Sequence, residues 1–175
     1  MDFKANYKVT ECEAFEPWLT SLCTESVKPT GKEKYYACPN PDEIIVLAGY
    51  ETYHGRVGDP ESFRLIYPSA VQQVYIRADA GSILLTSDSD LTCIDSAGPS
   101  WAMSHLTTND IVFDDVRGGI IYGNGEVDDK SDPAECPFEI EINSGKILKG
   151  GLSQGVTRSV ALNGRWSSDE LDKLF

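Results

Sequence analysis

The sequence predicts a mainly β protein built of antiparallel meander units, blade-like or sandwich-like, with a short helix near each end. Fifteen glycines and nine prolines recur between short apolar runs, which is the spacing of turns between strands. Three tripeptides, Asp79-Ala80-Gly81, Ser96-Ala97-Gly98 and Asn143-Ser144-Gly145, each supply a glycine for a tight hairpin. Helical periodicity appears only towards the two ends of the chain.

The first helix is expected over residues 14–24. Its apolar residues follow the helical spacing i, i+3, i+4 and i+7, and they are Phe15, Trp18, Leu19 and Leu22. The second is expected after Ser167, which forms a capping-box pattern with Glu170. We expect the apolar edge of this second helix to cover the core, with docking on a partner as the alternative.

The strands are expected in three units within a single domain, 1–175. The units are 43–68, 71–106 and 110–149, each with three or four strands in meander order, and their length is near that of a propeller blade. Propellers need about four or more blades, so a β-sandwich or an open meander is equally compatible. Residues 156–162 are expected to add a strand that pairs with the first unit. We expect residues 128–135 to form an acidic loop.

Composition excludes several classes of function. The chain has 28 acidic and 15 basic residues and a net charge of −13, which disfavours the coating of nucleic acid and electrostatic anchoring on anionic lipid. No apolar run has the length of a signal peptide core or of a membrane span. We therefore expect a soluble, cytoplasmic protein that binds neither nucleic acid nor membrane.

The residues that could carry chemistry form no recognisable motif. The five cysteines lack any C-x-x-C or C-x-x-H spacing, so we expect them reduced and mostly buried, with carboxylates near Cys136 disfavouring its thiolate. There are two histidines, expected on a strand surface or hydrogen-bonded in the core, and no G-x-S-x-G motif. The acidic segment 128–135 lacks the register of a calcium loop. We expect a non-enzymatic protein with no cofactor and no metal.

The end of the second unit and the third unit carry a familiar order of motifs. They are Trp101 to Leu106, Asp110-Ile111-Val112, the stretch G-G-I-I-Y-G at 118–123, P-F-E-I-E-I at 137–142 and Ser144-Gly145-Lys146. This pattern resembles a group of bacterial β-rich proteins for which we know no activity, and it covers residues 43–151. The resemblance implies a fold type and a bacterial origin, and no catalytic residue is carried over.

Acidic residues are densest between 110 and 141, where ten carboxylates accompany only Arg117 and Lys130. In the expected strand 138–142, alternation puts Glu139 and Glu141 on the solvent face. We expect a negative surface here that either keeps the protein soluble or binds a basic partner. The candidate partner-binding residues are Asp114, Asp115, Glu126, Asp128, Asp129, Asp132, Glu139 and Glu141.

Three functions fit these observations. The first is an acidic protein-binding module inside the cell, such as an immunity-type inhibitor of a basic toxin or enzyme. The second is a β-protein that binds a small ligand or carbohydrate in a pocket of aromatic and polar side chains. The third is an oligomeric scaffold.

Overall fold

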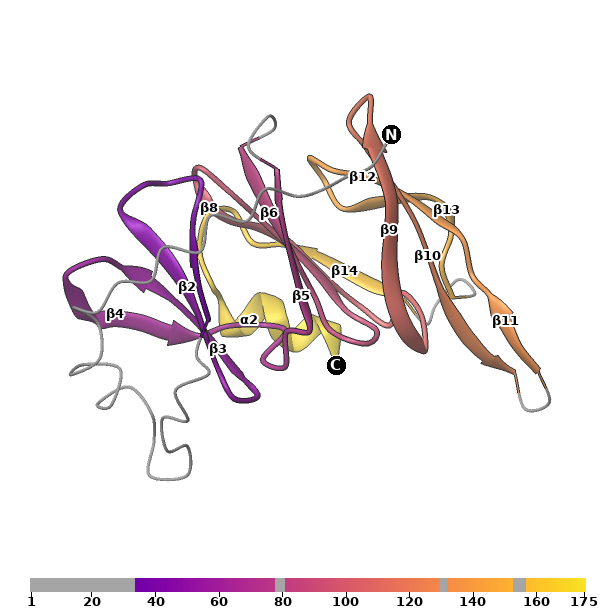
Figure 1. Cartoon of the computed structure of the whole chain (residues 1–175), viewed down its shortest axis with the longest axis horizontal. Helices are drawn as coiled ribbons and strands as arrows, with labels where there is room; N and C mark the ends of the chain where they lie inside the picture. The colour runs from indigo at the N-terminus through magenta and orange to yellow at the C-terminus, as the bar shows by residue number, and fades with distance from the viewer. Residues whose placement is uncertain (1–33, 78–80, 130–131, 153–156) are drawn as a thin grey trace.

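The structure is a computed structural model, and it describes residues 34–77, 81–129, 132–152 and 157–175. Three antiparallel sheets of meander strands follow one another along the long axis of the molecule (Figure 1). The mainly β class predicted from the sequence is confirmed. The helix expected over 14–24 lies outside the described residues.

The first sheet has the order β1-β2-β3-β4. Its strands are β1 (Lys34–Ala37), β2 (Glu43–Ala48), β3 (Glu51–Arg56) and β4 (Asp59–Leu65). The sequence analysis missed β1, and the turn between β3 and β4 consists of Val57 and Gly58. Pro60 lies within β4, which is an edge strand and therefore tolerates a residue without an N–H.

The second sheet has the order β14-β8-β7-β6-β5. Its strands are β5 (Gln73–Arg77), β6 (Ser82–Thr86), β7 (Leu91–Asp95), β8 (Gly98–Ser104) and β14 (Arg158–Ala161). The extra strand expected over 156–162 exists as β14, but its expected pairing with the first unit is wrong. It pairs with β8, so that Val160 lies opposite Ala102. The sequence carries no signal for this pairing because the partners are almost sixty residues apart.

The third sheet contains β9 (Asn109–Arg117), β10 (Ile120–Asp129), β11 (Asp132–Glu135), β12 (Phe138–Glu141) and β13 (Lys146–Gly150). Strand β10 pairs with β9 on one side and with β12 and then β11 on the other. The expectation of an acidic loop over 128–135 is therefore wrong for Asp128, Asp129 and Asp132–Glu135, which are strand residues. Asp, Pro and Glu have low strand propensity, but the backbone pairing of Glu126–Asp129 with Asp132–Glu135 overrides it.

The second sheet is the middle layer of a three-layer stack. Ile83 and Leu85 pack with Ile45 of the first sheet, whereas Leu84, between them, packs with Ile121 of the third. All five residues of β6 are buried, because both of its faces are covered. The two largest apolar clusters of the core fill the two interfaces between the three sheets.

The C-terminal helix exists as the short helix α2 (Ser168–Leu171), followed by the 3-10 turn η2 (Asp172–Leu174). Ser167 is the N-cap residue as predicted, but its side chain makes no capping hydrogen bond, so the capping box is wrong. Leu174 is fully buried against Ala102 and Leu162. The apolar edge of this helix therefore covers the core through Leu174, as expected, whereas Phe175 is 72% exposed.

Candidate functional site

The predicted acidic residues fall into two groups, of which the first lies on the outer face of the third sheet. The strand registers align Asp115, Tyr122, Glu139 and Lys149 in one row across the sheet. The next row contains Arg117, Ile120, Glu141 and Lys146. Glu139 and Glu141 point away from the core, as the alternation of β12 predicts.

Basic residues match the carboxylates on this face. Arg117 Nε lies 3.5 Å from Asp115 Oδ2, and Lys149 Nζ lies 3.5 Å from Glu139 Oε1. The guanidinium of Arg117 also lies 4.8 Å from the ring centre of Tyr122. The expectation of a negative surface is therefore wrong for these two rows, where three acids meet three bases. The lysines of β13 follow the acidic stretch in sequence, and only the strand pairing brings them beside it.

Asp114 is exposed and lies where β9 has an extra residue opposite the Tyr122–Gly123 step of β10. Gly123 and Gly125 lie at the two register shifts of this strand pair, which is a usual place for glycine in a strand. A Cβ on Gly123 would lie 2.4 Å from the ring of Phe138, and therefore no larger residue fits there.

The second acidic group lies on the hairpin of β10 and β11. The pairing of β9 with β10 ends at Asn109 and Glu126, whereas β10 and β11 stay paired from Glu126–Glu135 to Asp129–Asp132. The paired segments Glu126–Asp129 and Asp132–Glu135 extend beyond the rest of the third sheet (Figure 1). It carries five acidic residues and one basic residue, Lys130; the acids are Glu126, Asp128, Asp129, Asp132 and Glu135. We call residues 126–135 the acidic hairpin.

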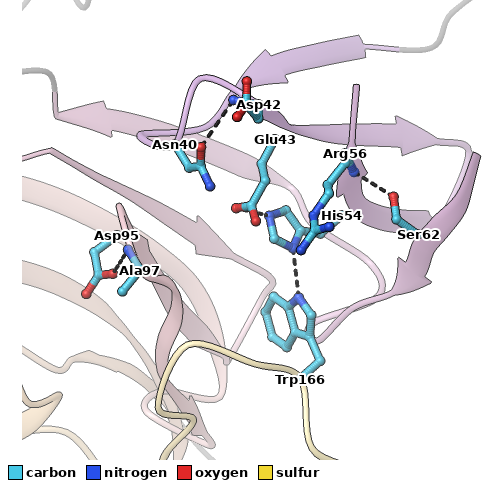
Figure 2. A network of polar contacts seen from close by, with 9 residues as sticks. All are labelled: Asn40, Asp42, Glu43, His54, Arg56, Ser62, Asp95, Ala97 and Trp166. Carbon is cyan, nitrogen blue, oxygen red and sulfur yellow. Dashed lines mark hydrogen bonds and ion pairs between the residues drawn. The ribbon is translucent and has the colours of Figure 1, made fainter. Parts of the chain in front are cut away.

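A partly buried polar cluster joins the first sheet to the C-terminal segment (Figure 2). His54, on β3, has a side chain only 8% exposed. Its Nε2 lies 3.2 Å from Glu43 Oε2 on β2, and its Nδ1 lies 3.1 Å from Nε1 of Trp166, which precedes α2. We call these three residues the His54 cluster. It confirms one of the two expectations for this histidine, namely a hydrogen-bonded core residue.

The hydrogen-bond partners of His54 determine which nitrogen of its imidazole carries the proton. The indole N–H of Trp166 can only donate, so Nδ1 of His54 is the acceptor and carries no proton. Nε2 then carries the single proton of a neutral ring and donates it to the carboxylate of Glu43. Burial lowers the pKa of His54, although the charge and hydrogen bond of Glu43 act in the opposite direction. Both nitrogens of this neutral ring are therefore engaged in hydrogen bonds.

The His54 cluster forms one wall of a polar cavity of about 420 Å³. Two arginines, Arg56 and Arg64, and two further acids, Asp59 and Glu61, also line it. The guanidinium of Arg64 donates to the backbone carbonyls of Glu61 and Phe63. The cavity therefore contains planar charged groups of both signs beside one aromatic ring. Sequence analysis missed this site because Trp166 and His54 are 112 residues apart.

The described cysteines fit the expectation of reduced, buried thiols. Cys38, Cys93 and Cys136 are free and buried, whereas Cys12 and Cys23 lie outside the described residues. Burial raises the pKa of Cys38 and also raises that of Cys93, to about 12. Burial likewise raises the pKa of Cys136, so the main cause is not its neighbouring carboxylates. The described part of the chain holds no group of three His, Cys, Asp or Glu side chains placed to bind a metal ion.

Comparison of the chain with family models, with curated proteins and with solved structures found no match. The resemblance to bacterial β-rich proteins therefore stays a prediction. The acidic hairpin and the cavity beside the His54 cluster are the two candidate sites of the structure. None of the helices in the described residues is long and apolar enough to cross a membrane.

Proposed function

We propose that this protein is a non-enzymatic protein-binding module that uses the acidic hairpin to bind a basic partner, as an immunity-type inhibitor of a cationic enzyme would. One observation supports this proposal more than any other. On the outer face of the third sheet Asp115 and Glu139 form ion pairs with Arg117 and Lys149, whereas the acidic hairpin has five carboxylates and one lysine where it extends beyond the rest of that sheet.

A concentrated charge on a projecting element suits recognition of a basic cleft. Complementary potentials raise the rate of association and exclude partners of the wrong charge. Such binding weakens as salt screens the charges, with a Debye length near 10 Å at 0.1 M ionic strength. The hairpin also leaves backbone groups of β11 unpaired by any described strand, and these can add hydrogen bonds to an extended partner segment.

A pair of triple variants tests the position of this site. Asp128, Asp129 and Asp132 are changed to Asn in one variant, and Asp115→Asn, Glu139→Gln and Glu141→Gln are combined in the other. Both variants lose three negative charges, so net charge alone cannot explain a difference between them. A partner captured on the immobilised wild-type chain is purified, and its Kd for each variant is measured at low and high salt.

We expect the hairpin variant to bind about tenfold or more weakly and with a smaller salt dependence, and the face variant to bind like the wild type. Equal weakening of both variants would mean that only net charge matters. Unchanged binding by the hairpin variant would exclude the hairpin as the site.

The cavity beside His54 favours a second candidate function, binding of a small polar ligand such as a sugar. Guanidinium and carboxylate groups can each make paired hydrogen bonds to neighbouring hydroxyls, and the cavity presents both kinds beside Trp166. A sugar-binding protein is expected to have several aromatic side chains in its pocket. The lining of this cavity contains one of them, Trp166.

Thermal unfolding with D-glucose, D-galactose and N-acetylglucosamine tests this candidate. A ligand that binds only the native state raises Tm with its concentration. We expect the rise to disappear in Arg56→Ala and to persist in Arg117→Ala, an equally charged variant on the third sheet. The absence of any rise with all three sugars, or a rise that survives Arg56→Ala, would count against the cavity as a sugar site.

A further inference from the structure

The two hydrogen bonds of His54 connect parts of the chain that are otherwise linked mainly by apolar packing. Trp166 packs against the apolar cluster shared by the first and second sheets and also against the cluster around Leu174. Its edge meets the imidazole of His54 at an interplanar angle of 74° (Figure 2). The Trp166–His54 bond is a polar tie between the first sheet and the C-terminal segment, and it exists only while Nδ1 has a free lone pair.

We propose that the His54 cluster is an acid-sensitive latch, which holds Trp166 against the first sheet at neutral pH and releases it when His54 is protonated. A proton taken from solvent forms its bond with the lone pair of Nδ1, the position that the indole N–H now occupies. The imidazolium is then a donor at both nitrogens and has no acceptor left for Trp166. Two donors face each other, and the indole has to move away.

The charged groups around the ring determine how readily this occurs. Glu43 on β2 favours the imidazolium, because its bond to Nε2–H becomes an ion pair. Asp59 and Glu61 on β4 line the same cavity and also favour the cation, whereas Arg56 on β3 and Arg64 on β4 oppose it. The C-terminal segment contributes only Trp166 to this lining, so it offers the imidazolium no carboxylate there. The protonated ring is therefore paired within the first sheet and not with the segment that it releases.

The release is local. Leu174 stays buried against the second sheet, and Ser104 Oγ donates to its carbonyl oxygen at 2.9 Å. Neither contact contains a group that titrates between neutral and mildly acidic pH. Protonation therefore separates the first sheet from Trp166 while α2 remains in place, and it opens one wall of the cavity.

The indole N–H signals of the full chain, followed by NMR from pH 8 to pH 4, test the latch. Trp166 is assigned by its loss in Trp166→Phe. Trp101 serves as an internal control, because its buried N–H donates to the carbonyl oxygen of Ile142, which does not titrate. We expect the Trp166 signal to titrate and its hydrogen exchange to rise about tenfold or more relative to Trp101. The Trp101 signal should stay in place.

Two variants separate His54 from other titrating groups. His54→Asn keeps an acceptor near the position of Nδ1 but does not titrate, so the Trp166 signal should lose its transition. Glu43→Gln removes the carboxylate that favours the imidazolium, and the midpoint should move to lower pH. A Trp166 signal that stays fixed to pH 4, one that moves only together with Trp101, or a transition that survives His54→Asn would each overturn the proposal.

Discussion

Trp101 and Gly145 show at the scale of single residues how a turn and a core side chain depend on each other. The Trp101 ring is 1% exposed in the interface between the second and third sheets, and its Nε1 lies 2.6 Å from the carbonyl oxygen of Ile142. Gly145 has φ of +65°, and a Cβ there would lie 2.5 Å from the ring. The glycine is therefore required both by its backbone conformation and by the side chain above it.

Gly145→Ala is expected to lower the free energy of unfolding by about 2–4 kcal/mol. Roughly 1–2 kcal/mol of this is the cost of a left-handed backbone for a residue with a Cβ, and the rest is the overpacking against Trp101. Urea unfolding measures the change. Gly118→Ala is the matched control, because Gly118 has φ of +58° with nothing within 4 Å of its Cβ position, so it should lose about 1–2 kcal/mol. Equal losses of unfolding free energy at the two positions would show that the Trp101 ring moves aside without destabilising the fold.

The sequence predicts the turn at Gly145 but not the ring above it. Asn143-Ser144-Gly145 is a local signal, because the residues that make the turn are adjacent in the chain. The contact with Trp101 depends on which sheets stack, and no local pattern encodes that. The same distinction applies to His54, whose strand was predicted whereas its partner Trp166 was not.

Among the strands, the predictions were most accurate where an apolar pattern has a clear period. Phe138 and Ile140 alternate with Glu139 and Glu141, and the structure buries the first pair and turns the second pair outwards. Apolar alternation did not predict the strand that is formed by polar residues. The segment Asp132–Glu135 has no apolar alternation, and only its pairing with β10 makes it extended.

The candidate acidic residues show that the distribution of surface charge is likewise not predicted by sequence order alone. A count along the chain groups Glu139 with Asp128 because both lie in one acidic stretch. The register instead places Glu139 opposite Lys149 and leaves Asp128 opposite Pro133. Cross-strand neighbours, and not neighbours in sequence, therefore determine where negative charge accumulates. The sequence indicates only an acidic region, whereas the strand register separates Glu139, which lies opposite a lysine, from the acidic hairpin.

For the whole molecule, the order of the layers makes His54 a point where distant segments meet. The second sheet lies between the other two, and the chain returns to it through β14 and α2 after completing the third sheet. This return brings Trp166 beside the first sheet, 112 residues after His54. The protonation of one side chain is therefore linked to the stability of the whole fold.

Global stability is expected to fall as the pH falls below about 6.5, the usual pKa of histidine, which the unfolded chain retains. Burial lowers the pKa of His54 in the folded state, so between the two pKa values the unfolded chain binds a proton that the native protein does not. The contribution of His54 is thus fully present above about pH 6.5, and it declines by up to about 1.4 kcal/mol per pH unit until the native histidine is also protonated. Urea unfolding from pH 8 to pH 5 measures the wild type against His54→Asn, so that carboxylates common to both cancel. A difference between the two proteins that stays constant over this range would show that His54 binds protons equally well in the folded and the unfolded chain.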